Sequence, residues 1–180
     1  MRIVSGKHKG RKLNVPKKLP VRPTTDRAKE ALFNILSNRI ELTETSVLDL
    51  FSGTGNMSYE FGSRGVNSIT AVDQSRACIN FIKSKAQELD LNITAIKSDV
   101  FKYLNRNKTQ YPLIFVDPPY ALSKRDFEKV HELVFEKNIL SEKGLLIIEH
   151  SEFLQLDHLS YFEETRDYGH SHFSFFNKPD

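Results

Sequence analysis

Short apolar runs and segments with helical spacing alternate along most of this chain. The apolar runs predict five strands, at residues 46–50, 68–73, 93–99, 111–117 and 144–150. Each of the first four runs is followed by a segment that predicts a helix, at residues 56–63, 76–89, 101–104 and 125–136. Because strands that alternate with helices pair in parallel through right-handed crossovers, this pattern predicts an α/β fold.

The pattern is different at the N-terminal end. Residues 2–15 predict a short hairpin that turns around residues 6–10, and three prolines then mark an extended connection. Residues 24–26 are all good N-cap types, and a helix is expected after them. Its apolar positions form one stripe, made of Ala28, Ala31, Leu32, Ile35 and Leu36.

The C-terminal end predicts a change from parallel to antiparallel pairing. Residues 162–168 and 170–176 read as two strands joined at Gly169. We therefore expect a seven-stranded, mostly parallel sheet that ends in an antiparallel hairpin. We expect one structural domain, with a basic hairpin arm at residues 1–23 and the main body at residues 24–180.

Composition places the chain among ordinary globular proteins. It has 180 residues, 39% hydrophobic and 27% charged, which is enough to build one real core. No apolar run is long enough for a membrane span, and no leader for secretion is visible. The single Cys78 excludes an internal disulfide and is expected to be buried, so we expect a cytoplasmic protein.

Basic residues are concentrated near the N-terminus. The net charge is +3, but the first 29 residues hold ten basic residues against the single acid Asp26. A basic arm on a mildly acidic body indicates a polyanionic partner, most simply nucleic acid; a solvated terminal hairpin is the alternative. The candidate nucleic-acid-binding residues of the hairpin are Lys7, Lys9, Arg11 and Lys12.

Three further basic residues surround the expected start of the first helix. Arg22, Arg27 and Lys29 either bind phosphates or a flipped base, or they pair with Asp26 and Glu30 and attach the arm to the body. The sequence leaves both interpretations open.

Residues 47–60 join an apolar strand, a glycine-rich turn and a helix. This order forms a nucleotide site in a Rossmann-like sheet. Gly53 and Gly55 allow a tight turn and leave the backbone bare where a ligand must approach. Ser58 stands where the dinucleotide fingerprint has its third glycine, which argues against NAD or FAD.

Asp49 ends this otherwise apolar strand. A carboxylate there needs a cationic or hydrogen-bonding partner. Together with Phe51, it favours a ligand that carries an amino group, and S-adenosylmethionine (SAM) fits. A plain strand–helix turn is the alternative.

Two more acids end the next two predicted strands. Asp73 lies about twenty residues beyond the glycines, where an acid binds ribose hydroxyls, and Gln74 follows it. Asp99 is placed to accept a hydrogen bond from an adenine amino group, with Val100 and Phe101 beside the ring. Each acid alone has the alternative role of a helix N-cap. Because parallel strands end at one edge of a sheet, three such acids predict one ligand site.

The most specific motif is Asp117-Pro118-Pro119-Tyr120, after the fourth predicted strand. The prolines make the loop rigid and leave carbonyl oxygens as acceptors. An amine on a base is a poor nucleophile because its lone pair is delocalised into the ring. Asp117 and the Pro118 carbonyl can hold the two N–H groups and favour a pyramidal nitrogen, while Tyr120 offers a stacking face. The motif predicts direct methyl transfer to a base amine by positioning and charge matching.

These motifs resemble those of the amino-methylating class I SAM methyltransferases, whose parallel sheet also ends in an antiparallel pair. Two N-terminal stretches, Arg2-Ile-Val-Ser-Gly and Arg22-Pro-Thr-Thr-Asp-Arg, narrow the resemblance to the bacterial 16S rRNA guanine-N2 methyltransferase family of the RsmD type. The similarity continues to Glu149 and to Tyr168-Gly169, so it covers nearly the whole chain. The chain departs from the family pattern at Asn56, Met57 and Ser58, where small residues and a third glycine are usual.

The resemblance implies a Rossmann-like enzyme that uses SAM, without a metal, to methylate N2 of a guanine in 16S rRNA. The substrate would be the small ribosomal subunit or its assembly intermediate, and we expect a monomer. The residues that it assigns to SAM are Asp49, Gly53, Gly55, Asp73 and Asp99. It assigns the guanine to residues 117–120, and it places Arg22, Thr24 and Arg27 near the RNA.

Three alternatives remain open. N6 of adenine in DNA or RNA would use the same Asp-Pro-Pro-Tyr chemistry, but a short basic arm favours an RNA whose folded shape supplies specificity. A non-catalytic RNA-binding or ribosome-assembly factor is disfavoured by the intact acids. An NAD-dependent dehydrogenase is disfavoured by Ser58. The six histidines show no metal-ligand spacing.

Overall fold

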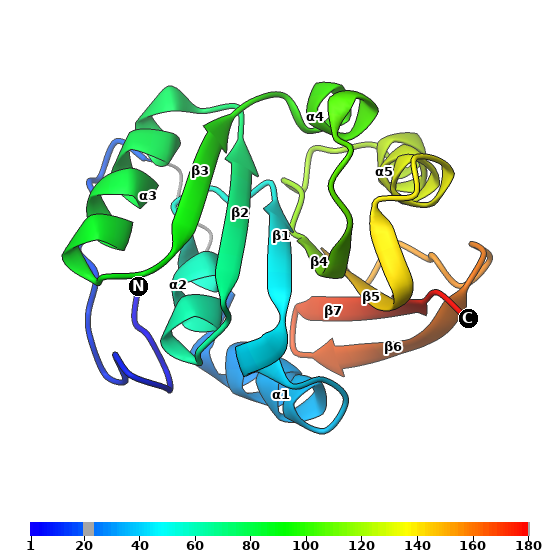
Figure 1. Ribbon diagram of the computed structural model, residues 1–180. Helices are drawn as coiled ribbons and strands as arrows, with labels where there is room; N and C mark the ends of the chain where they lie inside the picture. Colours follow the sequence, from blue (N-terminus) through cyan, green and yellow to red (C-terminus); the bar gives the residue numbers. More distant parts are fainter. Residues whose placement is uncertain (20–23, 180) are drawn as a thin grey trace.

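One seven-stranded sheet runs through the computed structural model, which describes residues 1–19 and 24–179 (Figure 1). Its spatial order is β3-β2-β1-β4-β5-β7-β6. The strands are β1 (Ser46–Leu50), β2 (Ser68–Asp73), β3 (Ile93–Lys97), β4 (Tyr111–Val116), β5 (Leu140–His150), β6 (Phe162–Tyr168) and β7 (Ser171–Asn177). The first five strands pair in parallel, and β7 lies antiparallel between β5 and β6. The predicted fold class is confirmed.

Helices cover both faces of this sheet (Figure 1). One face carries α1 (Asp26–Ser37), α2 (Asn56–Ser63) and α3 (Arg76–Glu88), and a short 3-10 helix, η1 (Leu42–Glu44), precedes β1. The opposite face carries α4 (Val100–Arg106) and α5 (Lys124–Glu136).

Alternate residues of the central strands supply the two cores. In β4, Leu113 and Phe115 pack with α1 and α2, whereas Ile114 and Val116 pack with α4 and α5. All four side chains are fully buried. Because both faces of β4 are covered, the strand reads as one apolar run, as is usual for parallel sheets between helices.

Two strand boundaries differ from the sequence-based prediction by two residues or more, each for a local reason. β3 ends at Lys97 rather than residue 99, because Asp99 leaves the sheet to cap α4, accepting from Lys102 N at 2.9 Å. β5 begins at Leu140 rather than residue 144, because Leu140 pairs with Tyr111 ahead of a register shift. The polar residues between Leu140 and the apolar run concealed this early pairing.

The N-terminal hairpin lies along α2. It holds one bridge, between Arg2 and Lys12, and its Ile3 and Leu13 are buried against α2 and α3. At the tip, Lys7 N donates to Ser63 O at 2.7 Å. Since Ser63 ends α2, the tip lies at the edge of the sheet opposite to the carboxyl ends of the strands. The predicted proline connection includes residues 20–23, which lie outside the described residues.

A buried carboxylate attaches this hairpin to the body. Glu60 of α2 is completely buried and accepts from Val4 N at 2.9 Å and from Ser5 N at 3.0 Å. Arg64 Nε donates to it at 2.9 Å, and Lys29 Nζ of α1 lies 3.2 Å away. One carboxylate therefore joins the hairpin, α1 and α2.

Lys29 completes the attachment. Its side chain is 1% exposed, and its ammonium donates to Arg2 O at 2.6 Å and to Asn56 Oδ1 at 3.1 Å. Asp26 accepts from Arg2 at the surface, 2.6 Å away. Of the two interpretations left open for Lys29, the structure supports attachment of the arm to the body, but through Glu60 and Arg2 O and not through Asp26 or Glu30.

We predict that Lys29→Met lowers the free energy of unfolding by about 3–5 kcal/mol, because it leaves the buried Glu60 carboxylate without its ammonium partner. Chemical denaturation monitored by circular dichroism measures this. The control is Lys85→Met, which breaks a surface pair with Glu88 and should cost less than about 1 kcal/mol. Equal losses for the two variants would contradict the role given to Lys29.

Candidate active site

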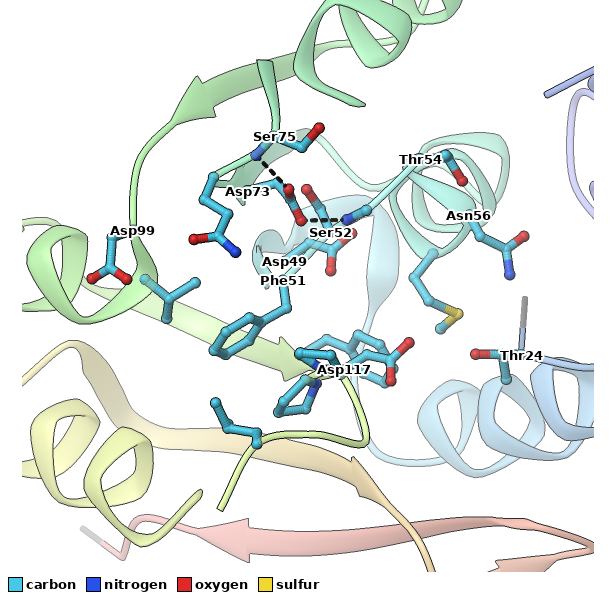
Figure 2. A pocket seen from close by; sticks show the side chains of 18 of the residues that line it. Thr24, Asp49, Phe51, Ser52, Thr54, Asn56, Asp73, Ser75, Asp99 and Asp117 are labelled. Carbon is cyan, nitrogen blue, oxygen red and sulfur yellow. Dashed lines mark hydrogen bonds between the residues drawn. The ribbon is translucent and has the colours of Figure 1, made fainter. Parts of the chain in front are cut away.

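A cavity of about 390 Å³ opens at the carboxyl ends of the parallel strands (Figure 2). Twelve residues predicted for the site line it: Thr24, Asp49, Phe51, Gly53, Asp73, Gln74, Asp99, Val100, Phe101, Asp117, Pro118 and Pro119. They come from segments far apart in the sequence, and the parallel strands bring their ends to one edge.

The glycine-rich turn after β1 forms one wall. Gly53 and Gly55 both have positive φ, 52° and 87°, as does Phe51 at 57°. A Cβ on Gly53 would meet no atom within 4 Å, so the backbone is bare on the side of the cavity. A Cβ on Gly55 would lie 2.8 Å from the Tyr59 ring. Gly55 is therefore needed for packing, and it does not line the cavity.

Asp49 is a buried carboxyl in the cavity wall. It is 1% exposed, and Ser58 Oγ donates to its Oδ2 at 2.5 Å. Burial raises the pKa of Asp49 to about 7, with a smaller contribution from the charge of Asp73, while the Ser58 hydrogen bond opposes the rise. Ser58, which replaces the usual third glycine, is thus the hydrogen-bonding partner that Asp49 requires.

Asp73 and Asp99 are held in fixed orientations. Asp73 accepts from Gly53 N at 2.9 Å and from Ser75 N at 2.8 Å, as Figure 2 shows. Asp99 is the N-cap of α4, so for this residue the capping interpretation is correct, and it lines the cavity as well. Asp73 caps no helix, because Ser75 caps α3.

The Asp117-Pro118-Pro119 loop forms the opposite wall. It follows β4, the central neighbour of β1, and Asp117 N donates to Leu50 O at 3.2 Å. Tyr120 is 57% exposed and does not line this cavity. It lines an adjoining cavity of about 200 Å³ with Pro118 and Phe153, and Phe153 is 87% exposed. The stacking role of Tyr120 stays a prediction.

The basic residues lie outside the cavity wall. Lys7, Lys9, Arg11, Lys12 and Arg27 are exposed, and none of them lines the cavity. Arg11 pairs with Glu88 at 2.7 Å, and Lys7 lies 3.9 Å from Asp90. Lys12 lines a neighbouring cavity that shares Thr24 and Asn56 with the first one. Arg22 lies outside the described residues.

Several lining residues were not predicted: Ser52, Thr54, Asn56, Met57, Ser75, Phe115 and Leu122. Asn56 and Met57 follow the glycine turn, so their position beside a predicted site was a usable signal. No sequence signal pointed to Phe115 or Leu122. The sequence indicates a core strand position for Phe115 and a loop position for Leu122.

Residues 1–19 and 24–179 contain neither a candidate metal-binding cluster nor a candidate membrane-spanning helix. No group of three or more His, Cys, Asp or Glu side chains there is placed to hold a metal. No helix of that part of the chain has the length and apolar character needed to cross a bilayer. Cys78 is a buried free thiol, as predicted.

Fold and site together define a class I SAM-dependent methyltransferase. The sheet order with β7 inserted antiparallel, the acid-lined cavity and the Asp-Pro-Pro loop belong to that class. The residues of the cavity fit SAM. The carboxylates of Asp49, Asp73 and Asp99 line it, and the backbone at Gly53 is bare on its side of the cavity.

Comparison with known proteins identifies the family. The family model described as "Conserved hypothetical protein 95" matches residues 1–177. Ribosomal RNA small subunit methyltransferase D of Escherichia coli is 33% identical over 150 residues, which cover 83% of this chain and 74% of that protein. The Haemophilus influenzae protein of the same name is 31% identical over 154 residues, covering 83% and 78%. This chain belongs to the family that this model describes, and it is a relative of the ribosomal RNA small subunit methyltransferases D.

Solved structures agree on the fold. The yhhF protein of E. coli has a TM-score of 0.85 and 26% identity, and the match covers 99% of this chain and 98% of that chain. The Thermus thermophilus 16S rRNA N2 G1207 methyltransferase, solved with AdoMet and guanosine, shares the fold at a TM-score of 0.68 and 20% identity. That match covers 86% of this chain and 44% of the other.

We predict that the ligand-free protein loses stability through Asp49 as pH rises from about 4 to 7. The folded protein keeps this carboxyl protonated to about pH 7, whereas the unfolded chain releases the proton near pH 3.8. The folded state therefore binds more protons across this window, and its stability falls as pH rises. Three pKa units correspond to about 4 kcal/mol.

The measurement is urea denaturation of the wild type and of Asp49→Asn at several pH values. The free energy of unfolding of the wild type should fall relative to that of Asp49→Asn by several kcal/mol between about pH 4 and pH 7. Asp157→Asn, at an exposed acid, is the control and should give a flat difference. A flat difference for Asp49→Asn as well would mean that Asp49 has an ordinary pKa.

Proposed function

We propose that this protein transfers a methyl group from SAM to the exocyclic N2 amine of a guanine in 16S rRNA of the small ribosomal subunit. One observation carries the proposal: the three strand-end acids and the Asp117-Pro118-Pro119 loop line the same cavity. A methyl donor and an amine acceptor held on its two walls would meet inside it. The names of the E. coli and H. influenzae relatives support the choice of small-subunit rRNA.

On the cofactor side, each acid has a matching group of SAM. In the ligand-free protein, burial disfavours the charged form of Asp49. The ammonium of the methionine moiety of SAM would stabilise that charged form. Asp73, oriented by two backbone N–H groups, would accept from the ribose hydroxyls. Asp99 would accept from the adenine amino group beside Val100. When bound, SAM supplies an electrophilic methyl on a sulfonium.

On the acceptor side, the protein orients the amine. The Asp117 carboxylate and the Pro118 carbonyl would each accept one N–H of the amino group, which directs its lone pair toward the methyl. The rigid prolines hold these acceptors before the substrate arrives, so little reorganisation is needed during transfer. The proton leaves after the new N–C bond forms, to water or to Asp117.

The substrate setting extends the proposal. We place the acceptor in a small subunit or its assembly intermediate, because a short basic arm cannot itself read a long sequence and a folded RNA particle supplies shape. The protein would act in the cytoplasm as a monomer. Adenine N6 methylation and a non-catalytic role are outcomes of the test below.

The decisive experiment uses labelled SAM and small subunits from a strain that lacks this gene. The RNA is digested and the labelled nucleoside is identified by mass. We expect N2-methylguanosine with the wild type and no detectable label with Asp117→Ala. SAM affinity of Asp117→Ala should stay within a few-fold of the wild type, because Asp117 acts on the acceptor.

Each other outcome has a definite meaning. Methyladenosine would overturn the guanine assignment. SAM binding without transfer to subunits or to free 16S rRNA would contradict the proposed substrate, and absence of SAM binding would favour the non-catalytic role. Loss of SAM binding in Asp117→Ala would overturn the acceptor role of Asp117.

We predict a second effect on RNA binding. Of the candidate basic residues of the hairpin, Lys12 lies closest to the active site, since its cavity shares Thr24 and Asn56 with the first cavity. Lys12→Ala should weaken binding to small subunits and lower the slope of log affinity against log salt by about one. Filter binding over a salt series measures the slope. Lys108→Ala is the control, because Lys108 is exposed and lies near the amino end of β4, away from the carboxyl ends where the cavity opens. Equal salt slopes for the two variants would show that the arm is not part of the RNA interface.

A further inference from the structure

The hydroxyl of Thr24 has a fixed hydrogen-bonding role, because its only proton already has an acceptor. It lies just before α1 and is 5% exposed, and its Oγ1 donates to Glu149 Oε2 at 2.9 Å. A carboxylate only accepts hydrogen bonds, so the single proton of this hydroxyl is committed to Glu149. What Thr24 Oγ1 still offers to a ligand is a lone pair.

Glu149 holds the hydroxyl in that role. It is 3% exposed near the end of β5, a strand paired on both sides by β4 and β7. Its second oxygen accepts from Ser171 Oγ at 2.9 Å. Because Val116 pairs with Ile148 in the parallel register, the next residues along the two strands are Asp117 and Glu149.

Thr24 and Asp117 line the same cavity, and Figure 2 shows the Thr24 hydroxyl and the Asp117 carboxylate directed toward each other. Both are acceptors. The Watson–Crick edge of guanine presents donors at N1–H and at the N2 amine, whereas adenine has an acceptor at N1. A wall made of acceptors therefore matches guanine and opposes adenine.

We propose that Thr24 Oγ1 accepts a hydrogen bond from N1–H of the target guanine, and that Glu149 is the positioning residue that keeps this oxygen an acceptor. The pair selects guanine over bases that lack a proton at N1. This inference rests on the proposed function and adds the residue that determines which base is accepted.

The test compares two nucleosides, guanosine and 2-aminopurine riboside. Both carry the exocyclic amine, but 2-aminopurine has no proton at N1. Binding to the protein loaded with S-adenosylhomocysteine is followed by NMR titration. We expect the wild type to bind guanosine about tenfold more tightly or better, since an unmatched polar pair in a buried site is costly.

Thr24→Val keeps the shape of the side chain and removes the acceptor, so its preference should fall to within about twofold. Thr24→Ser keeps the hydroxyl and should keep the preference. Since 2-aminopurine also lacks O6 in every variant, the change in the ratio between variants reports the contact at N1. Thr25→Val is the matched control: Thr25 caps α1 and does not line this cavity, so it should lower stability without changing the ratio.

Two results would overturn the inference: an unchanged ratio in Thr24→Val, or a wild type that shows no preference for guanosine, including binding of neither nucleoside. Failure of the proposed function would be seen separately, as the absence of N2-methylguanosine in the labelling experiment. N2-methylguanosine together with an unchanged ratio in Thr24→Val would leave the function intact and remove only the role of Thr24.

Discussion

The buried carboxylate of Glu60 connects the parts of this structure that the sheet does not. It accepts hydrogen bonds from the backbone of the hairpin and from Arg64, and it forms an ion pair with Lys29. A fully buried charge is tolerated only when such partners surround it, so the hairpin, α1 and α2 must assemble together. Lys29 also donates to Asn56, which begins α2 and lines the active-site cavity. The ammonium of Lys29 therefore contacts both the hairpin arm, at Arg2 O, and the cavity wall, at Asn56.

The active site is a second place where carboxylates are held at a cost. Asp49 is buried beside Asp73, and its raised pKa shows that the ligand-free protein disfavours its charge. Ser58 offsets part of that cost through one hydrogen bond. A site that is electrostatically incomplete without a cation is suited to a cofactor with an ammonium group and a sulfonium. Ser58, at the position of the third glycine of the dinucleotide fingerprint, is therefore part of the electrostatic balance of the site.

Much of this fold could be predicted from the sequence because its signals are local. Strands β1, β2 and β6 and helix α2 have their predicted bounds, since a glycine follows β1, α2 and β6 within three residues and β2 ends at the acid Asp73. The cavity-lining acids could also be predicted, because parallel strands place their carboxyl ends at one edge. The boundary at Asp99 depends on a cap that the sequence offered only as an alternative, and the boundary at Leu140 depends on a cross-strand pair that no local pattern predicts.

The sequence alone determined the order of elements, the α/β class, the acid at each strand end and the place of the Asp-Pro-Pro loop after β4, since these depend on residue type and spacing along the chain. Only the tertiary structure decided what distant side chains do to one another. The sequence left Lys29 as a phosphate-binding residue or as a partner of Asp26 and Glu30, yet it is buried against Glu60. Thr24 is a good helix-cap residue type, yet it donates to Glu149 across 125 residues of chain. Burial and hydrogen-bond polarity are set by such long-range contacts, and they decide whether a charged or polar side chain attaches a segment, binds a cofactor or reads a base.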